Sequence, residues 1–198
     1  MCILFTHASA QAADVNSVKA TIVKHAIEMG VDPAIALSIA RTESGFRHEA
    51  RSSHGAVGVF QLMPSTARRM GLNPYSLNDN IKGGIMYYKK MYNMFGSVEL
   101  ALAAYNAGPG NVKKYNAIPP FGETRRFVSK IMSDVNRQKA APDPIVAKVR
   151  SGAYSAQKPA GVIKPASAPK LIDAKDLQVE ILEEKPIELK LETLTISI

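Results

Sequence analysis

One glutamate in this sequence has surroundings suited to acid chemistry. Glu43 follows a mostly apolar segment and directly precedes Ser44 and Gly45. A glutamate near a helix end is ordinarily a surface residue. Burial would disfavour the charged form of its carboxyl group and raise its pKa. A carboxyl group that stays protonated near neutral pH can donate a proton to a glycosidic oxygen, so Glu43 is a candidate general acid.

Two later clusters place further polar groups beside glycine. The first is Gly58-Val59-Phe60-Gln61, and the second is Ala104-Tyr105-Asn106-Ala107-Gly108. They offer two amides and a phenol. Because glycine lets backbone approach backbone or ligand closely, both clusters are candidates for a binding groove. An acid that faces amide and phenol groups suits chemistry at a glycosidic bond.

A second carboxylate is harder to find. Ordinary glycosidases need one, either as the nucleophile or to activate water. Glu49 and Asp79 lie in polar segments, where we expect them to be solvated. Glu123 begins a predicted helix, where an acid also interacts favourably with the helix dipole, so it is either a cap or a site residue. A mechanism with one acid would require the substrate to supply its own nucleophile.

The hydrophobic pattern predicts an all-helical domain that spans residues 14–140. Apolar residues recur at helical spacing, and glycine, proline and serine mark the ends of the segments. Glu43 is expected at the C-terminal end of a buried helix. The predicted helices cover residues 14–29, 32–43, 64–71, 78–95, 98–105, 111–115 and 123–137.

The rest of the chain has a different composition. Residues 1–13 resemble the end of a secretory signal with an A-x-A site but without a basic region, which favours a periplasmic or secreted protein. Residues 141–170 are rich in Pro, Ala and Ser, which predicts a linker. Residues 171–198 hold seven acids against three bases and are either a disordered tail or a partner-binding anchor. No apolar run approaches the roughly 20 residues of a transmembrane helix, so none is expected.

Charge and cysteine content limit the partners. The net charge is +8, and residues 14–140 hold 17 Lys and Arg against 9 Asp and Glu. This excess suits either a solvated surface or attraction to a polyanion. Basic residues do not alternate with aromatic ones, so the charge does not favour nucleic acid. With Cys2 as the single cysteine and four scattered histidines, we expect no disulfide, no metal site and no cofactor.

Several motifs in order make residues 18–137 resemble the soluble lytic transglycosylase family of peptidoglycan-cleaving enzymes, which has a goose-type-lysozyme-like fold. Their order and spacing match the family's pattern. The motifs are Glu43-Ser44-Gly45-Phe46, then Ser52 and Gly55, then Gly58-Val59-Phe60-Gln61-Leu62-Met63-Pro64, then Ala104-Tyr105-Asn106-Ala107-Gly108-Pro109-Gly110, and finally Glu123-Thr124-Arg125-Arg126-Phe127-Val128.

The resemblance implies a reaction. Glu43 would protonate the oxygen between N-acetylmuramic acid and N-acetylglucosamine, and the muramyl acetamido group would assist at the anomeric carbon. Glu43 would then take the proton of the muramyl 6-hydroxyl, which closes a 1,6-anhydro ring. Tyr105 would position the acetamido group or the acid, and Glu123 would contact substrate or support the site. The saccharide groove would be lined by Ser52, Gln61, Met63 and Asn106.

Two departures from the family and several alternatives stay open at this point. Tyrosine is common where this chain has Phe127, and the missing hydroxyl removes one possible hydrogen bond, though the ring is still expected to pack. The family often has methionine where this chain has Phe60, and the bulkier ring is expected to narrow a subsite. A lysozyme-like hydrolase on the same fold would leave a reducing end instead of an anhydro end. An inactive wall-binding scaffold is disfavoured by the intact Glu43, Gln61 and Tyr105. General wall turnover and a role in a secretion, conjugation or pilus assembly are both compatible with the sequence.

Overall fold

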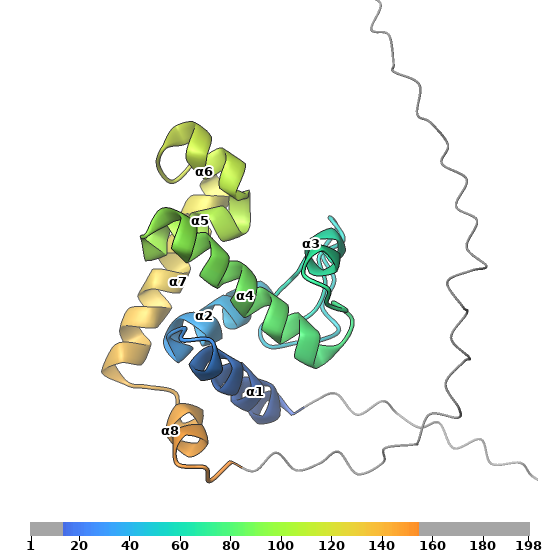
Figure 1. Ribbon diagram of the computed structural model, residues 1–198. Helices are drawn as coiled ribbons and strands as arrows, with labels where there is room; N and C mark the ends of the chain where they lie inside the picture. The colour runs from blue at the N-terminus through green and yellow to red at the C-terminus, as the bar shows by residue number, and fades with distance from the viewer. Residues whose placement is uncertain (1–13, 155–198) are drawn as a thin grey trace, which may run out of the picture. The chain divides into compact units, whose positions relative to one another are not determined.

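The computed structural model describes residues 14–154, which form eight α-helices and no β-strand (Figure 1). This confirms the all-helical class. The signal-like segment, most of the predicted linker and the acidic tail lie outside the described residues. The helices are α1 (Val15–Glu28), α2 (Pro33–Ser44), α3 (Pro64–Arg69), α4 (Leu77–Phe95), α5 (Val98–Ala107), α6 (Pro109–Tyr115), α7 (Gly122–Ala140) and α8 (Pro144–Arg150).

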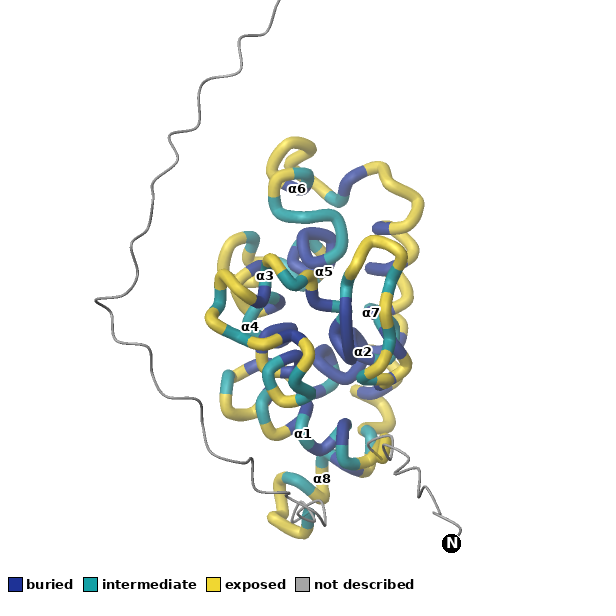
Figure 2. The backbone as a smooth tube through the Cα atoms, turned by 90° about the vertical axis from the view of Figure 1, so that its right-hand side faces the viewer, coloured by how far each residue is buried: buried dark blue, intermediate teal, exposed yellow. Residues whose placement is uncertain are grey.

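Helix α2 is the buried element that carries the candidate acid (Figure 2). It starts where the Asp32 side chain accepts a hydrogen bond from the Ala34 N–H, with Pro33 in the first turn. It packs against α1 and α7. Its buried residues are Pro33, Ile35, Ala36, Leu37, Ser38, Ile39, Ala40 and Ser44. Within residues 14–154, no helix combines the length and apolar character needed to cross a membrane.

A buried polar cluster sets the orientation of α7 against α2. Asp134 of α7 is 4% exposed and accepts a hydrogen bond of 2.8 Å from the Ser38 hydroxyl of α2. Gln138 donates to the same hydroxyl at 2.8 Å, and Arg41 and Arg137 form ion pairs with Asp134. Because a buried carboxylate without partners is costly, this cluster favours one rotation of α7 over others.

Helix α8 corrects the predicted start of the linker at residue 141. The Asp143 side chain caps this helix by accepting a hydrogen bond from the Ile145 N–H at 3.1 Å. Ile145 is 4% exposed within the core, and α8 packs against α1. Asp143 also forms a salt bridge of 2.8 Å with Lys19 of α1. The sequence analysis did not predict this helix, because seven residues are too few to show a clear helical periodicity and the surrounding prolines favoured a linker.

We expect removal of α8 to destabilise the domain. A chain that ends at Ala140 loses the buried Ile145 side chain and the Lys19–Asp143 salt bridge. Its free energy of unfolding should fall by about 2–4 kcal/mol relative to a chain that ends at Tyr154. Urea denaturation followed by circular dichroism measures the difference. Ile145→Ala in the longer chain should reproduce part of the loss, and equal stability of the two chains would contradict the role given to α8.

Candidate active site

Glu43 is the penultimate residue of α2 and lies where that helix leaves the core. The preceding Ile39 and Ala40 are fully buried, whereas Glu43 itself is partly exposed. The helix ends at Gly45 in the left-handed conformation, with φ of 62°. Phe46 is also left-handed, with φ of 70°, so the chain turns sharply after the acid. Glu43 is thereby held between the apolar core and solvent.

The surroundings of Glu43 favour its protonated form. Burial raises the pKa of its carboxyl group to about 8, and the negative charge of Glu123 contributes to the increase. Among residues 14–154, no salt bridge or hydrogen bond stabilises its carboxylate. Nearby Arg41 instead pairs with Asp134 and Asp143 and lies over the Phe46 ring. Glu43 can therefore carry a proton at neutral pH, as a general acid requires.

The loop between Val57 and Leu62 is fixed next to the acid by hydrogen bonds from two helices. Ser44, which directly follows Glu43, donates its hydroxyl proton to the Val59 carbonyl at 2.8 Å. The Tyr105 hydroxyl of α5 donates to the Phe60 carbonyl at 2.8 Å. These bonds bind the loop to the end of α2 on one side and to α5 on the other, so the loop is held against the part of α2 that carries Glu43.

A third helix holds the same loop through Asn80 of α4, a residue that the sequence analysis missed. Asn80 is fully buried, accepts a hydrogen bond from the Phe60 N–H at 3.0 Å and donates to the Val57 carbonyl at 2.8 Å. Gly58 lies against it with φ of 78°, and a Cβ at that position would come within 2.5 Å of the Asn80 amide. The sequence held one indication that Asn80 is buried, because it lies four residues before Gly84 and so shares a helical face with that buried glycine.

We expect Asn80→Ala to loosen the loop and destabilise the domain. The change leaves the Phe60 N–H without its partner and removes the side-chain donor to the Val57 and Pro74 carbonyls, although the Val57 carbonyl keeps its bond from the Leu62 N–H. This should cost about 2–3 kcal/mol in the free energy of unfolding. Urea denaturation measures it. Asn93→Ala, which removes an exposed amide from the same helix, is the matched control and should change stability little. A neutral Asn80→Ala would show that the loop does not depend on this amide.

The position of Phe60 corrects an expectation from the sequence. Its side chain is fully buried and lies over Gly84 of α4, where an added Cβ would come within 2.2 Å of the Phe60 ring. Phe60 therefore belongs to the core and does not narrow a subsite. The sequence could not show this, because Gly84 is distant along the chain and only the packing of α4 brings it beneath the ring.

Three predicted groove residues lie on or beside this loop. The Gln61 side chain donates to the carbonyls of Gly58 and Ala50 at 2.9 and 3.2 Å, so its amide nitrogen shapes the loop. The Ser52 hydroxyl accepts a hydrogen bond from the Ala56 N–H at 3.0 Å and stabilises the preceding turn. Met63 is 40% exposed at the N-cap of α3. Their contacts with substrate remain predictions.

Tyr105 lies beside the acid, although its hydroxyl proton is already engaged. Burial, followed by the charge of Glu43 and the neighbouring Tyr87, raises the pKa of Tyr105 well above its ordinary value. Because it donates to the Phe60 carbonyl, its hydroxyl proton is not free for an acetamido group. Its ring stacks on Phe127 of α7 with a centroid distance of 6.3 Å. Tyr105 thus connects the loop, the acid and α7.

Asn106 and Glu123 meet where α5 ends and α7 begins. The Thr124 hydroxyl donates to the side-chain oxygen of Asn106 at 2.7 Å, a contact that the sequence analysis did not anticipate. Thr124 is buried, whereas Glu123 before it is exposed in the first turn of α7. The structure therefore brings Glu43, Tyr105, Asn106 and Glu123 together, and the Gln61 loop adjoins them.

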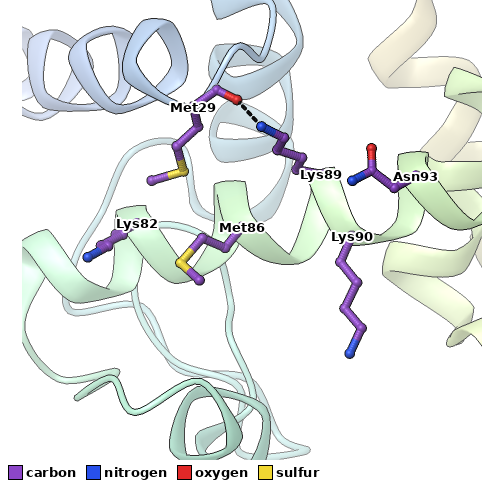
Figure 3. Close-up of a pocket in the computed structure, with 6 residues that line it drawn as sticks. All are labelled: Met29, Lys82, Met86, Lys89, Lys90 and Asn93. Atoms are coloured by element: carbon purple, nitrogen blue, oxygen red, sulfur yellow. Dashed lines mark hydrogen bonds between the residues drawn. The ribbon is translucent and has the colours of Figure 1, made fainter.

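A hollow on the outer face of α4 shares no residue with this site (Figure 3). In it, the Lys89 ammonium donates a hydrogen bond of 2.5 Å to the Met29 carbonyl. Lys82 and Lys90 point in different directions and do not converge on a common point (Figure 3). Its lining contains no carboxyl group, so it offers no acid for catalysis.

The helical fold and the single acid at the end of a buried helix define a lysozyme-like domain. Residues 20–128 match the family described as the transglycosylase SLT domain, and the chain belongs to that family. The family indicated by the motifs is therefore confirmed.

Relatives and solved structures agree with this membership. The chain is 31% identical over 127 residues to a transglycosylase of Enterobacteria phage PRD1, covering 64% of this chain and 46% of that protein. It is 32% identical to the soluble lytic murein transglycosylase of Salmonella typhimurium, covering 52% of this chain and 20% of that protein. The chain thus spans less than half the length of these relatives.

Two crystal structures share the fold. One is an inactive Glu→Gln mutant of the lytic transglycosylase Slt from Pseudomonas aeruginosa, with 34% identity, a TM-score of 0.55 and coverage of 65% of this chain and 25% of that one. The other is the 70 kDa soluble lytic transglycosylase of Escherichia coli, with 27% identity, a TM-score of 0.56 and coverage of 64% and 25%.

Proposed function

We propose that the chain is a peptidoglycan lytic transglycosylase. It cleaves the β-1,4 bond between N-acetylmuramic acid and N-acetylglucosamine and leaves a 1,6-anhydromuramoyl end. The observation that carries the proposal is Glu43, an acid at the end of a buried helix whose pKa is raised to about 8. Membership in the SLT family and relatives named lytic murein transglycosylases support the same activity.

In the first step, the Glu43 carboxyl group donates its proton to the glycosidic oxygen. The bond between that oxygen and the muramyl C1 breaks, and the N-acetylglucosamine portion leaves with a hydroxyl group. The carbonyl oxygen of the muramyl acetamido group bonds to C1 and takes up the developing positive charge. The substrate thus supplies the nucleophile that a second carboxylate supplies in ordinary retaining enzymes.

In the second step, the Glu43 carboxylate removes the proton of the muramyl C6 hydroxyl. The C6 oxygen bonds to C1, and the bond between C1 and the acetamido oxygen breaks. This restores the acetamido group and closes the anhydro ring, while Glu43 returns to its protonated form. No water is consumed. The raised pKa serves both steps, because it keeps the acid protonated at the start and makes its carboxylate a stronger base afterwards.

The surrounding residues have supporting roles in the proposal. Tyr105 and the Ser44–Val59 hydrogen bond hold the loop against the acid, and Asn106 and Gln61 face the saccharide. Glu123 raises the pKa of Glu43 through its negative charge and contacts the substrate from the start of α7. Ser52 and Met63 extend the groove along the loop.

A lysozyme-like hydrolase is the second candidate, because Glu123 lies close enough to influence Glu43 and could activate water. Mass spectrometry of the products from isolated sacculi distinguishes the two. A transglycosylase releases anhydromuropeptides, and a hydrolase releases reducing muropeptides heavier by one water. Reducing ends as the main product would overturn the proposed reaction, and Glu43→Gln serves as the control that should release neither product.

The site of action follows from the substrate. Peptidoglycan lies outside the cytoplasmic membrane, so we propose that the protein works in the periplasm or after secretion. One of its relatives is named membrane-bound lytic murein transglycosylase F, from Desulfosudis oleivorans. General wall turnover and local opening of the wall for a secretion, conjugation or pilus assembly use the same chemistry. Fractionation of cells, together with co-purification from the envelope, separates these roles.

A further inference from the structure

Two aromatic side chains near the start of α7 face solvent although they are ordered against each other. Tyr115 is 41% exposed and Phe121 is 38% exposed. Their ring centroids lie 5.9 Å apart, and the ring planes are nearly perpendicular, at 85°. The Lys114 ammonium lies 5.6 Å from the centroid of the Tyr115 ring. Paired exposed aromatic rings commonly mark a binding surface, because their apolar faces are otherwise left in water.

The aromatic pair adjoins the candidate active site. Tyr115 is the last residue of α6, and Phe121 is the N-cap of α7, two residues before Glu123. Helix α6 packs against α5, and Figure 1 shows it at the end of α5 and beside the start of α7. The Thr124 hydroxyl donates to the Asn106 side chain at 2.7 Å, so the start of α7, where Phe121 lies, is held against the end of α5 that carries Asn106.

The backbone around the pair is constrained before any ligand binds. Helix α6 ends at Asn116 in the left-handed conformation, with φ of 46°. The connection to α7 then passes through Pro119 and Pro120, whose rings limit backbone freedom. Binding to such a surface costs little conformational entropy.

We propose that Tyr115 and Phe121 form a stacking platform for a sugar ring of the glycan strand, one or more residues away from the bond that is cleaved. This inference rests on the proposed function, since it assigns a distal subsite to the same groove. A pyranose ring presents C–H groups on one face, which pack on an aromatic ring, while its hydroxyl groups point outward to water and to donors such as Lys114.

Glycan strands of different length distinguish a distal subsite from a general effect on catalysis. A long strand reaches the platform, whereas the shortest strand that the protein cleaves occupies only the subsites around Glu43. The full-length chain, Tyr115→Ala, Phe121→Ala and the double variant are compared on both substrates. Tyr92→Ala is the matched control, because Tyr92 is 42% exposed on α4 and lies outside the site.

For the double variant, kcat/KM on long strands should fall roughly 10-fold, mainly through KM, and should stay unchanged on the shortest strand. Tyr92→Ala should match the wild type on both. Circular dichroism and thermal unfolding verify that the variants are folded. An equal loss on both substrates, or no loss on either, would overturn the platform.

A binding measurement keeps the inference testable if the proposed reaction is wrong. In the Glu43→Gln background, no turnover is needed, and calorimetry reports the Kd for intact long strands. The double substitution should raise this Kd roughly 10-fold. An unchanged Kd overturns the platform even where anhydro products are found. A raised Kd without anhydro products retains the platform and refutes only the proposed reaction.

Discussion

Glu43→Gln is expected to abolish the release of muropeptides while the fold is retained. Glutamine preserves the shape of the side chain but can neither donate nor accept the proton. In the proposed mechanism, one carboxyl group carries out the proton transfer of both steps, so no other residue can replace it in either step. General acid–base catalysis contributes about 10²–10⁴-fold, and we expect a loss of at least about 10²-fold in kcat. Assays of muropeptide release from sacculi measure it.

Two controls separate loss of chemistry from loss of structure. Glu49→Gln removes an exposed glutamate six residues further along and should retain activity. The Glu43→Gln protein should also be the more stable one above neutral pH. The wild-type acid contributes fully to stability below its ordinary pKa of 4.5, and that contribution is lost as the pH rises toward 8. Retention of more than about a tenth of the wild-type rate by Glu43→Gln would refute the assignment.

The second large effect concerns pH. The basic limb of kcat/KM is expected near pH 8, because Glu43 must be protonated in the free enzyme before cleavage. The limb of a solvated glutamate would lie near its ordinary pKa of 4.5. Burial is the main cause of the difference, and Glu123 adds to it. Activity should therefore persist at neutral pH and fall as the pH rises through 8. Initial rates on a soluble glycan strand across this range measure the limb.

Removal of the charge of Glu123 tests the second cause of the raised pKa of Glu43. Glu123→Gln should move the basic limb to lower pH, because the carboxylate of Glu43 then no longer faces a negative charge. Glu99→Gln removes an exposed acid from the first turn of α5 and should leave the limb in place. A limb at the value of free glutamate would contradict the buried position of the acid. A limb near 8 that Glu123→Gln does not move would leave burial as its sole cause.

Much of this protein could be predicted from local sequence features. Apolar residues at helical spacing, with glycine and proline at the ends, determine where the helices form. The apolar residues before Glu43 and the glycine after it place the acid at the end of a buried helix. These features depend on residues within a few positions of one another, which is why sequence alone predicted the all-helical class and the position of Glu43 at the end of a buried helix.

The contacts of the site depended on the tertiary structure. Asn80 acts on the loop from another helix, and Phe60 lies over Gly84 instead of in the groove. Ile145 and Asp143 join the core through α1, so the folded part continues past the predicted boundary. No local pattern reports these contacts, because they depend on which faces of distant helices meet.

The pKa of Glu43 likewise depends partly on the local sequence and partly on the tertiary structure. The sequence placed a carboxyl group beside apolar residues and therefore predicted the direction of its pKa shift. The extent of the shift was decided by three-dimensional packing. Arg41 is paired with Asp134 and Asp143 and does not neutralise Glu43, while Glu123 comes close from the start of another helix. A pKa responds to every charge and every desolvated contact within a few ångströms, and only the folded chain determines which residues those are.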